Sequence, residues 1–144
     1  RFQRFAIDTI RNYKSKKSLQ IAEHSQISAT LYWHTTNTQI RIKANIKKTD
    51  NLYNQEYFSR RSSEKNALAI SSNQSEKIST YNDVSKKYKV VRDSQNLSIC
   101  PDYWGGYAFK PFYFEFWKGH ESRLNERIVF DKVGKSWIRY ILEP

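Results

Sequence analysis

The chain lacks methionine and holds a single cysteine, Cys100, among its 144 residues. One cysteine cannot form an internal disulfide, so we expect a reduced, cytoplasmic protein. No apolar run approaches the length that spans a bilayer and none resembles a signal peptide, so we expect no membrane association. Because the chain begins with Arg1 and not with methionine, we expect its N-terminal end to be incomplete.

Signatures of several enzyme classes are also missing. The three histidines, His24, His34 and His120, lie far apart in sequence and Cys100 has no cysteine partner, so we expect no metal site. The sequence contains neither a Gly-x-Ser-x-Gly turn nor a glycine-rich phosphate loop. Cys100 precedes Pro101, and we expect its thiol to be packed and not catalytic.

Positive charge and aromatic rings are abundant. The 25 Lys and Arg residues outnumber the 14 Asp and Glu residues, which gives a formal net charge of +11. Such an excess favours an anionic partner, whether nucleic acid, acidic lipid or a phosphorylated small molecule, and a solvated cationic surface is the alternative. Aromatics make up 15% of the residues, which predicts one packed domain and not a disordered tail.

The first elements that the sequence predicts are a short strand at residues 4–8 and a helix at residues 15–23. Lys16 and Lys17 stand near the start of this helix, where basic residues oppose the helix dipole. A bound anion there would remove the conflict, because helix N-termini offer free N–H groups to phosphates. Two solvated lysines are the alternative interpretation.

The middle of the chain predicts an antiparallel hairpin followed by helices. Residues 27–33 have strand composition, and residues 40–46 alternate between apolar and polar side chains after a turn at residues 35–37. Asp50 is a good N-cap for a helix that runs to about Arg60. The further predicted elements are a short helix at residues 66–71, a surface helix within residues 72–91, and strands at residues 112–117, 127–131 and 136–142. Strands dominate and no βαβ alternation appears, which favours a mainly β fold, an antiparallel barrel with appended helices.

The region between Trp104 and Arg127 has the clearest chemical character. Two adjacent glycines, Gly105 and Gly106, allow a sharp turn or a close approach of the backbone. An aromatic strand is followed by Arg123 and Arg127, which gives a stacking surface beside cationic forks that suit phosphates and planar rings. An aromatic core with surface arginines is the alternative interpretation.

Three motifs in this region together resemble the C-terminal signature of the pyridoxamine 5′-phosphate oxidase family. They are P-x-Y-W-G-G-Y at residues 101–107, E-F-W-x-G at residues 115–119 and R-L-x-x-R at residues 123–127. The resemblance extends back through most of the chain, to Ser15-Lys-Lys-Ser18, Trp33-His34 with Gln39, Tyr57-Phe-Ser-Arg-Arg61 and Gln74-Ser75.

The resemblance implies an antiparallel FMN-binding split β-barrel that forms a homodimer with FMN at the subunit interface. We expect residues 1–144 to be one such domain without the family's N-terminal strands, and residues 101–144 to be its C-terminal dimerisation and active-site region. The implied FMN-binding residues are Lys16 and Lys17 for the phosphate, with Gln39, Gln74, Ser75, Trp117 and Arg127 for the flavin. The implied substrate-binding residues are Tyr57, Arg61, Lys65, Arg123 and Asn125, with Arg123 as the catalytic residue over the pyridine ring.

The implied activity is oxidation of pyridoxamine or pyridoxine 5′-phosphate to pyridoxal 5′-phosphate, with dioxygen as acceptor. Asn125 stands where the family has a histidine and Lys65 where it has a serine, which favours, as an alternative, a flavin-binding relative that is a reductase of another substrate or a flavin store. A basic nucleic-acid-binding domain is a remote alternative, because positive charge and aromatic rings suit single strands. No recognition-helix pattern or RNA-binding signature supports it, so we expect no nucleic-acid partner.

Overall fold

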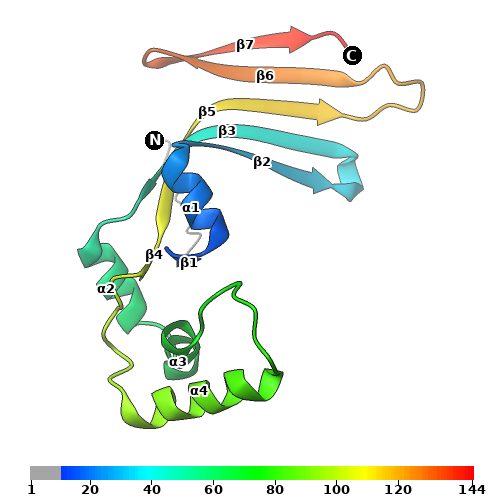
Figure 1. The fold of residues 1–144 in the computed structure, drawn as a ribbon. Coiled ribbons are helices and arrows are strands. Elements are labelled where there is room, and N and C mark those ends of the chain that lie inside the picture. Colours follow the sequence, from blue (N-terminus) through cyan, green and yellow to red (C-terminus); the bar gives the residue numbers. More distant parts are fainter. Residues whose placement is uncertain (1–10) are drawn as a thin grey trace. The chain divides into compact units, whose positions relative to one another are not determined.

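A computed structural model of the protein describes residues 11–144 (Figure 1). The strand predicted at residues 4–8 lies outside the described residues. The described chain divides into two compact units. One contains residues 24–46 and 109–144, and the other contains residues 11–23 and 47–108.

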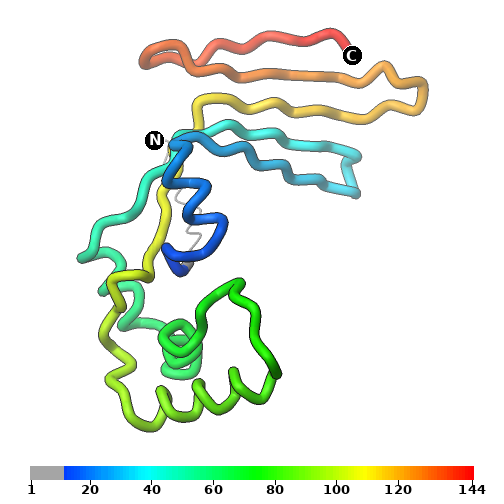
Figure 2. The backbone as a smooth tube through the Cα atoms, in the orientation of Figure 1, coloured from blue at the N-terminus to red at the C-terminus, as the bar shows by residue number. Residues whose placement is uncertain are grey.

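The first unit is built on an antiparallel sheet of five strands in the order β2-β3-β5-β6-β7. Its elements are β2 (Gln26–Trp33), the short 3-10 helix η1 (His34–Thr36), β3 (Thr38–Lys48), β5 (Tyr107–Lys118), β6 (Glu126–Val133) and β7 (Ser136–Leu142). Figures 1 and 2 show the strands side by side, with hairpin turns from β2 to β3, from β5 to β6 and from β6 to β7. The antiparallel β architecture expected from the sequence is confirmed.

Alternation of apolar and polar residues explains the predicted hairpin, which is confirmed. β2 pairs with β3 in antiparallel register along its whole length. Ile40, Ala44 and Ile46 are buried on one face of β3, as a side-chain period of two requires. The connecting turn closes at Asn37, whose φ of 48° is left-handed and suits asparagine.

The register of β5 and β6 places the aromatic strand beside an arginine. Trp117 lies opposite Arg127, and Glu115 lies opposite Val129. Because alternate residues of a strand share a face, Tyr113, Glu115 and Trp117 project from the same side of the sheet. This face of the sheet therefore combines rings and charges.

The second unit consists of helices and a short strand pair. These are α1 (Lys16–Glu23), α2 (Asn51–Ser59), α3 (Ser63–Ser71), α4 (Tyr81–Ser94), and β1 (Arg11–Asn12) paired with β4 (Trp104–Gly105). Phe58 is fully buried and meets the Trp104 ring edge-on, with ring centroids 4.7 Å apart. Ala67 of α3 is also fully buried, and α3 packs beside α4 (Figure 1). Within residues 11–144, no helix has both the length and the apolar character needed to cross a bilayer.

Side-chain caps set where the helices begin. Asp50 Oδ1 accepts a hydrogen bond at 2.7 Å from the backbone N–H three residues later, which confirms the predicted N-cap of α2. α3 begins at Ser63, earlier than predicted, because the Ser62 side chain caps its first turn. Thr80 and Asp83 form a capping box at the start of α4.

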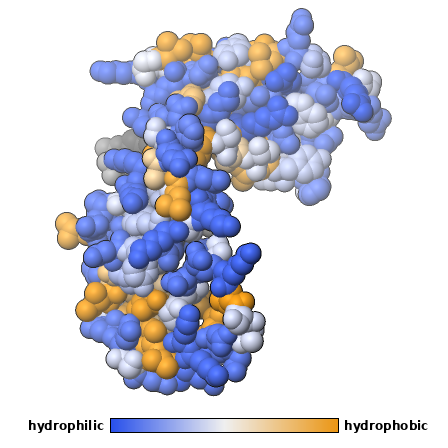
Figure 3. All heavy atoms as spheres, viewed as in Figure 1, coloured by the Kyte–Doolittle hydropathy of each residue, from blue (hydrophilic) through white to orange (hydrophobic). Residues whose placement is uncertain are grey.

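Large apolar side chains are exposed on β7, an outer strand of the sheet. Trp137, Ile138, Tyr140 and Ile141 are between 36% and 63% exposed. Figure 3 shows hydrophobic patches along this edge, within a largely hydrophilic face. An apolar edge of this kind is typical of surfaces that associate.

Replacing Asp50 with alanine should lower the free energy of unfolding by about 1 kcal/mol, because the first turn of α2 loses its cap. Urea denaturation followed by circular dichroism measures this quantity. The control, Asp50→Asn, keeps an acceptor oxygen and should stay within about 0.5 kcal/mol of the parent protein. Equal losses in both variants would show that the cap is not the source of the stabilisation.

Candidate functional site

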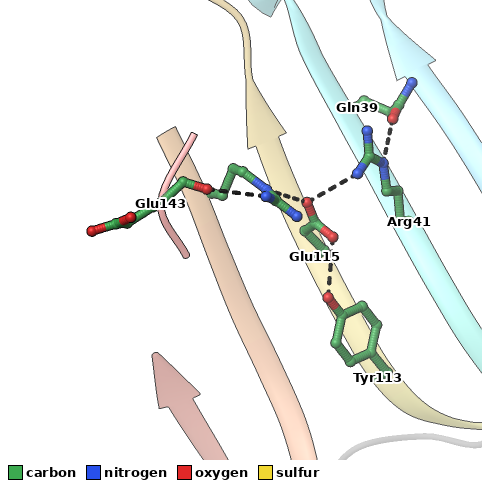
Figure 4. Close-up of polar contacts among 6 residues, drawn as sticks. Gln39, Arg41, Tyr113, Glu115 and Glu143 are labelled. Carbon is green, nitrogen blue, oxygen red and sulfur yellow. Dashed lines mark hydrogen bonds and ion pairs between the residues drawn. The ribbon is translucent and has the colours of Figure 1, made fainter. Parts of the chain in front are cut away.

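A buried carboxylate connects three strands of the sheet (Figure 4). Glu115 on β5 exposes only 5% of its side chain, and its Oε1 accepts from Arg127 Nε at 2.8 Å and from Arg41 Nη1 at 3.2 Å. Its Oε2 accepts from the Tyr113 hydroxyl at 3.0 Å. With Gln39, these four residues form what we call the Glu115 network. Two guanidinium groups around one carboxylate leave the network with a net positive charge.

The same contacts shift pKa values within the network. Burial alone would raise the pKa of Glu115, but hydrogen bonds from Arg127 and Tyr113, with the charge of Arg41, outweigh burial and hold this pKa below its usual value. Burial and the hydrogen bond to Glu115 raise the pKa of Tyr113 to about 12. Glu115 is therefore ionised and Tyr113 neutral at physiological pH.

Two predicted flavin-site residues, Gln39 and Arg127, belong to this network. Gln39 Oε1 accepts from Arg41 Nε at 2.5 Å, and Arg127 Nη1 donates to the backbone carbonyl of Glu143 at 3.0 Å. Trp117, a third predicted residue, lies opposite Arg127 in the β5–β6 register. Within residues 11–144, Arg127 Nη2, Arg41 Nη2 and Gln39 Nε2 have no hydrogen-bond partner, so these donors remain for a ligand.

In the second unit, the predicted substrate residues Tyr57 and Arg61 come together at Trp104, and the backbone of Lys65 contacts Arg61. The guanidinium carbon of Arg61 lies 4.6 Å from the centre of the Trp104 ring, and the Tyr57 and Trp104 ring centroids are 6.4 Å apart. Arg61 Nη2 donates a long hydrogen bond of 3.5 Å to the Lys65 backbone carbonyl. We call these four residues the Arg61 cluster.

The guanidinium group of Arg61 has few hydrogen-bond acceptors within the described residues. Burial lowers its pKa, against the raising effects of Tyr57 and Cys100. Among the described residues, its Nη1 is a buried nitrogen that has no hydrogen-bond partner. Because a buried N–H without an acceptor is costly, this atom suits the oxygen of an anionic group.

The helix predicted to carry Lys16 and Lys17 is confirmed, and it begins at Lys16. Ser15 Oγ accepts from the Ser18 backbone N–H at 3.4 Å, at the start of the first turn. Both lysines are exposed, and that turn contains no acidic residue. The helix start therefore keeps its positive charge, which suits a phosphate.

Two predicted site residues lie on left-handed backbone. Ser75, which follows Gln74 in the exposed loop between α3 and α4, has a φ of 73°. Arg123, in the turn between β5 and β6, has a φ of 64°. Such conformations cost on the order of 1 kcal/mol for residues with a Cβ, and they concentrate at functional positions.

Asn125, the predicted substrate residue that replaces the family's histidine, holds this turn together. Its Oδ1 accepts from the His120 backbone N–H at 3.1 Å, and its own N–H donates to the Arg123 carbonyl at 2.8 Å. The amide oxygen of Asn125 is thus engaged within the protein, and its role toward a substrate stays a prediction.

The glycine pair and the cysteine have packing roles. A Cβ on Gly105 would collide with the Tyr13 hydroxyl and the Asn54 amide, so the close approach that glycine permits is to the protein itself. Cys100 Sγ lies 3.5 Å from the Trp104 carbonyl oxygen, and burial raises its pKa. The thiol is therefore neutral and packed, as expected.

Three residues of the network, Arg41, Tyr113 and Glu115, were not predicted as site residues. Glu115 opens the E-F-W-x-G motif and shares a strand face with Tyr113 and Trp117. A carboxylate within an aromatic strand needs a cationic partner, so the sequence could have indicated that Glu115 pairs with an arginine or lysine. Which cation would meet it depends on strand pairing, and the sequence does not state that pairing.

The chain is similar to a family of known proteins. The family model described as "Pyridoxine 5'-phosphate oxidase C-terminal dimerisation region" matches residues 104–144. Pyridoxine/pyridoxamine 5′-phosphate oxidases of Colwellia psychrerythraea and Leptospira interrogans are 31% and 33% identical to the chain over 135 and 136 residues, each covering 92% of it. The chain spans 62% and 64% of the length of these two relatives.

Two solved structures share the fold. PhzG from Burkholderia lata 383, in complex with tetrahydrophenazine-1-carboxylic acid, matches with a TM-score of 0.84 and 23% identity, over 96% of this chain and 69% of PhzG. A pyridoxamine 5′-phosphate oxidase-related, FMN-binding protein from Nostoc punctiforme PCC 73102 matches with a TM-score of 0.70 and 13% identity, over 94% of this chain and 71% of that protein. The split-barrel fold expected from the resemblance is confirmed.

The pKa of Tyr113 predicts a loss of stability at high pH. The neutral phenol is favoured in the folded protein, so its stabilising effect is complete below the ordinary tyrosine pKa of about 10 and is lost as pH rises from there toward about 12. Urea unfolding of the parent protein and of Tyr113→Phe should therefore give free energies that converge above pH 10. Parallel pH profiles would contradict this assignment.

Proposed function

Because this chain belongs to the pyridoxamine 5′-phosphate oxidase family, we propose that it is an FMN-dependent oxidase that converts pyridoxamine or pyridoxine 5′-phosphate to pyridoxal 5′-phosphate. The observation that best supports this proposal is the Arg61 cluster, where a buried guanidinium nitrogen has no acceptor in the described chain. A substrate phosphate would supply that acceptor. The chemistry that FMN supplies when bound is acceptance of a hydride from substrate, with reoxidation by dioxygen to give hydrogen peroxide.

Each unit has residues that fit one part of FMN. Lys16 and Lys17, at a helix start without acidic residues, would hold its phosphate. The remaining donors of Gln39 and Arg127 would bond the carbonyl-bearing ring system, beside Trp117. Gln74 and Ser75 would complete the flavin site, as the resemblance implies.

The substrate would be held by its phosphate and its ring. Arg61, with Tyr57 and Lys65, would bind the phosphate, because a desolvated guanidinium favours an oxyanion. Arg123, fixed in its turn by left-handed backbone, would lie over the pyridine ring. These residues position the substrate and balance its charge, so no strong acid or base is required.

The proposed active form is a homodimer with FMN at the interface between its two copies. The match of residues 104–144 to a dimerisation-region family supports this form. So does the apolar surface of β7, since exposed side chains such as Trp137 and Ile141 lose contact with water when covered.

One observation favours a second candidate, a flavin oxidoreductase that acts on a different ring. The Asn125 side-chain oxygen is already bonded to the His120 backbone N–H and cannot act as the family's histidine would. PhzG, whose crystal contains a phenazine derivative, shares this fold with a TM-score of 0.84. The two candidates share the flavin site and differ in the substrate.

Two measurements on the purified protein test the proposal. FMN titration followed by quenching of flavin fluorescence should show stoichiometric binding, and a protein that takes up no FMN would refute both candidates. With FMN bound, pyridoxamine 5′-phosphate should be turned over at about 1 per second or faster, with hydrogen peroxide as product. FMN binding without this turnover would favour the second candidate.

Replacing Arg61 with alanine should raise the KM for a phosphorylated substrate by about tenfold to a hundredfold with a smaller effect on kcat, because a charged hydrogen bond to phosphate is lost. The matched control is Arg60→Ala, since Arg60 is the adjacent arginine, is exposed and pairs with Glu56. That control should leave KM within about twofold. An unchanged KM in Arg61→Ala would show that the substrate phosphate binds elsewhere.

Replacing Trp117 or Arg127 with alanine should weaken FMN binding about tenfold or more, because each removes a contact to the ring system. Fluorescence quenching gives the Kd of each variant. Arg92→Ala, which removes an exposed arginine of α4 that pairs with Asp93, should bind FMN as the parent protein does. If Trp117→Ala and Arg92→Ala have the same Kd, the flavin does not lie at this face of the sheet.

A further inference from the structure

The Glu115 network contains more cationic groups than its carboxylate requires. Oε1 of Glu115 accepts hydrogen bonds from two guanidinium groups, at 2.8 Å and 3.2 Å, and the Glu115 side chain is almost fully buried. A structural ion pair between two strands needs only one arginine. Here β3 and β6 each supply one, Arg41 and Arg127, to the same oxygen of β5 (Figure 4).

Each arginine uses only one of its guanidinium nitrogens to bond Glu115. Arg127 gives Nε to the carboxylate and Nη1 to the Glu143 carbonyl. Arg41 gives Nη1 to the carboxylate and Nε to Gln39 Oε1. A guanidinium is planar, so two bonds of this kind fix both the plane and the direction of the third nitrogen.

Gln39 is oriented at the end of this chain of contacts. Its amide oxygen accepts from Arg41, so its Nε2 is the group left over. The side-chain oxygens of Glu115 and Gln39 are thus engaged inside the network. A ligand here meets N–H groups from three side chains.

We propose that Glu115 is a positioning residue that orients Arg127 directly and Gln39 through Arg41. Because Glu115 fixes Arg41 as well, Arg41 is a third donor to the flavin. This inference rests on the proposed function, which assigns Gln39 and Arg127 as flavin contacts. The matching ligand chemistry is a planar ring edge that carries carbonyl oxygens and develops negative charge when it is reduced. Arg41 and Glu115 add to the residues that the family motifs indicated.

The charge state of Glu115 supports this role. Its pKa lies below the usual value despite burial, because Arg127, Tyr113 and Arg41 all stabilise the ionised form. The carboxylate is therefore a permanent anchor at neutral pH. Glu115→Gln keeps the shape of the side chain but removes its negative charge, and with its oxygen toward the two arginines its amide group would face the Tyr113 hydroxyl.

The test begins with the FMN Kd of the parent protein, Glu115→Gln and Glu126→Gln, measured by fluorescence quenching. Glu115→Gln should weaken FMN binding about tenfold, because the guanidinium groups lose their fixed directions. Glu126→Gln removes the same charge from an exposed neighbour of Arg127 and should bind FMN as the parent protein does. Parent-like binding by Glu115→Gln would overturn the inference and leave the proposed function standing.

A double-mutant cycle separates positioning from a purely structural role. Arg127→Lys keeps a cation beside Glu115 but removes the fork that Glu115 orients. In that background, Glu115→Gln should weaken FMN binding by less than it does in the parent protein, since the part of the loss that acts through Arg127 is already present. Independent effects would multiply, and full multiplication of the two losses would overturn the inference.

Arg41→Lys provides a test that does not depend on the folding of Glu115→Gln. A lysine retains the charge toward Glu115 but cannot hold Gln39 at the same time, so FMN binding should weaken about as much as in Gln39→Ala. Circular dichroism of each apo variant shows whether the fold is retained. Parent-like FMN binding by a folded Arg41→Lys would overturn the inference, whereas a parent protein that binds no FMN would overturn the proposed function and the inference together.

Discussion

A carboxylate inside the sheet constrains the rest of the first unit. Removing the partner of a buried charge typically costs about 3–5 kcal/mol, so Glu115 is compatible with its position only while at least one arginine faces it. This requirement links β3, β5 and β6 through side chains as well as through the backbone ladder. A slip of one residue in either pairing would turn one of these arginines to the opposite face, and Glu115 would lose that contact. The polar contact therefore specifies register, whereas apolar burial supplies the driving force.

Much of the architecture could be predicted because its causes are local. The alternation at residues 40–46 produced a strand with Ile40 and Ala44 buried, and Asp50 produced the predicted cap. The three linked motifs of the C-terminal region pointed to the family, and Tyr57 and Arg61 are neighbours in space as well as in sequence. Tyr57 lies in the last turn of α2 and Arg61 lies two residues beyond its end, where its backbone N–H donates to the Phe58 carbonyl, so a local turn brings the two residues together.

What escaped prediction depends on partners that are distant in the chain. Arg41 and Glu115 are separated by 74 positions, and only the strand order brings them together. From the sequence, the backbone at the glycine pair could approach either a ligand or another part of the protein. In the structure, Gly105 lies against Tyr13 and Asn54, so the approach is to the protein. The engagement of Asn125 with a backbone N–H likewise follows from the shape of its turn. Sequence patterns indicate what a side chain can do, and tertiary geometry determines which capacity is used.

If two copies cover the apolar side chains of β7, as proposed above, protein concentration becomes a thermodynamic variable for this chain. Side chains such as Trp137 and Ile138 face water in a single copy, and every collision that covers them releases hydration free energy. Mass action then couples folding to association, so a dilute sample and a concentrated one differ in stability although the contacts within each copy are the same. Natural variation along β7 would accordingly alter the concentration at which the protein stays folded before it altered the chemistry of the Glu115 network and the Arg61 cluster.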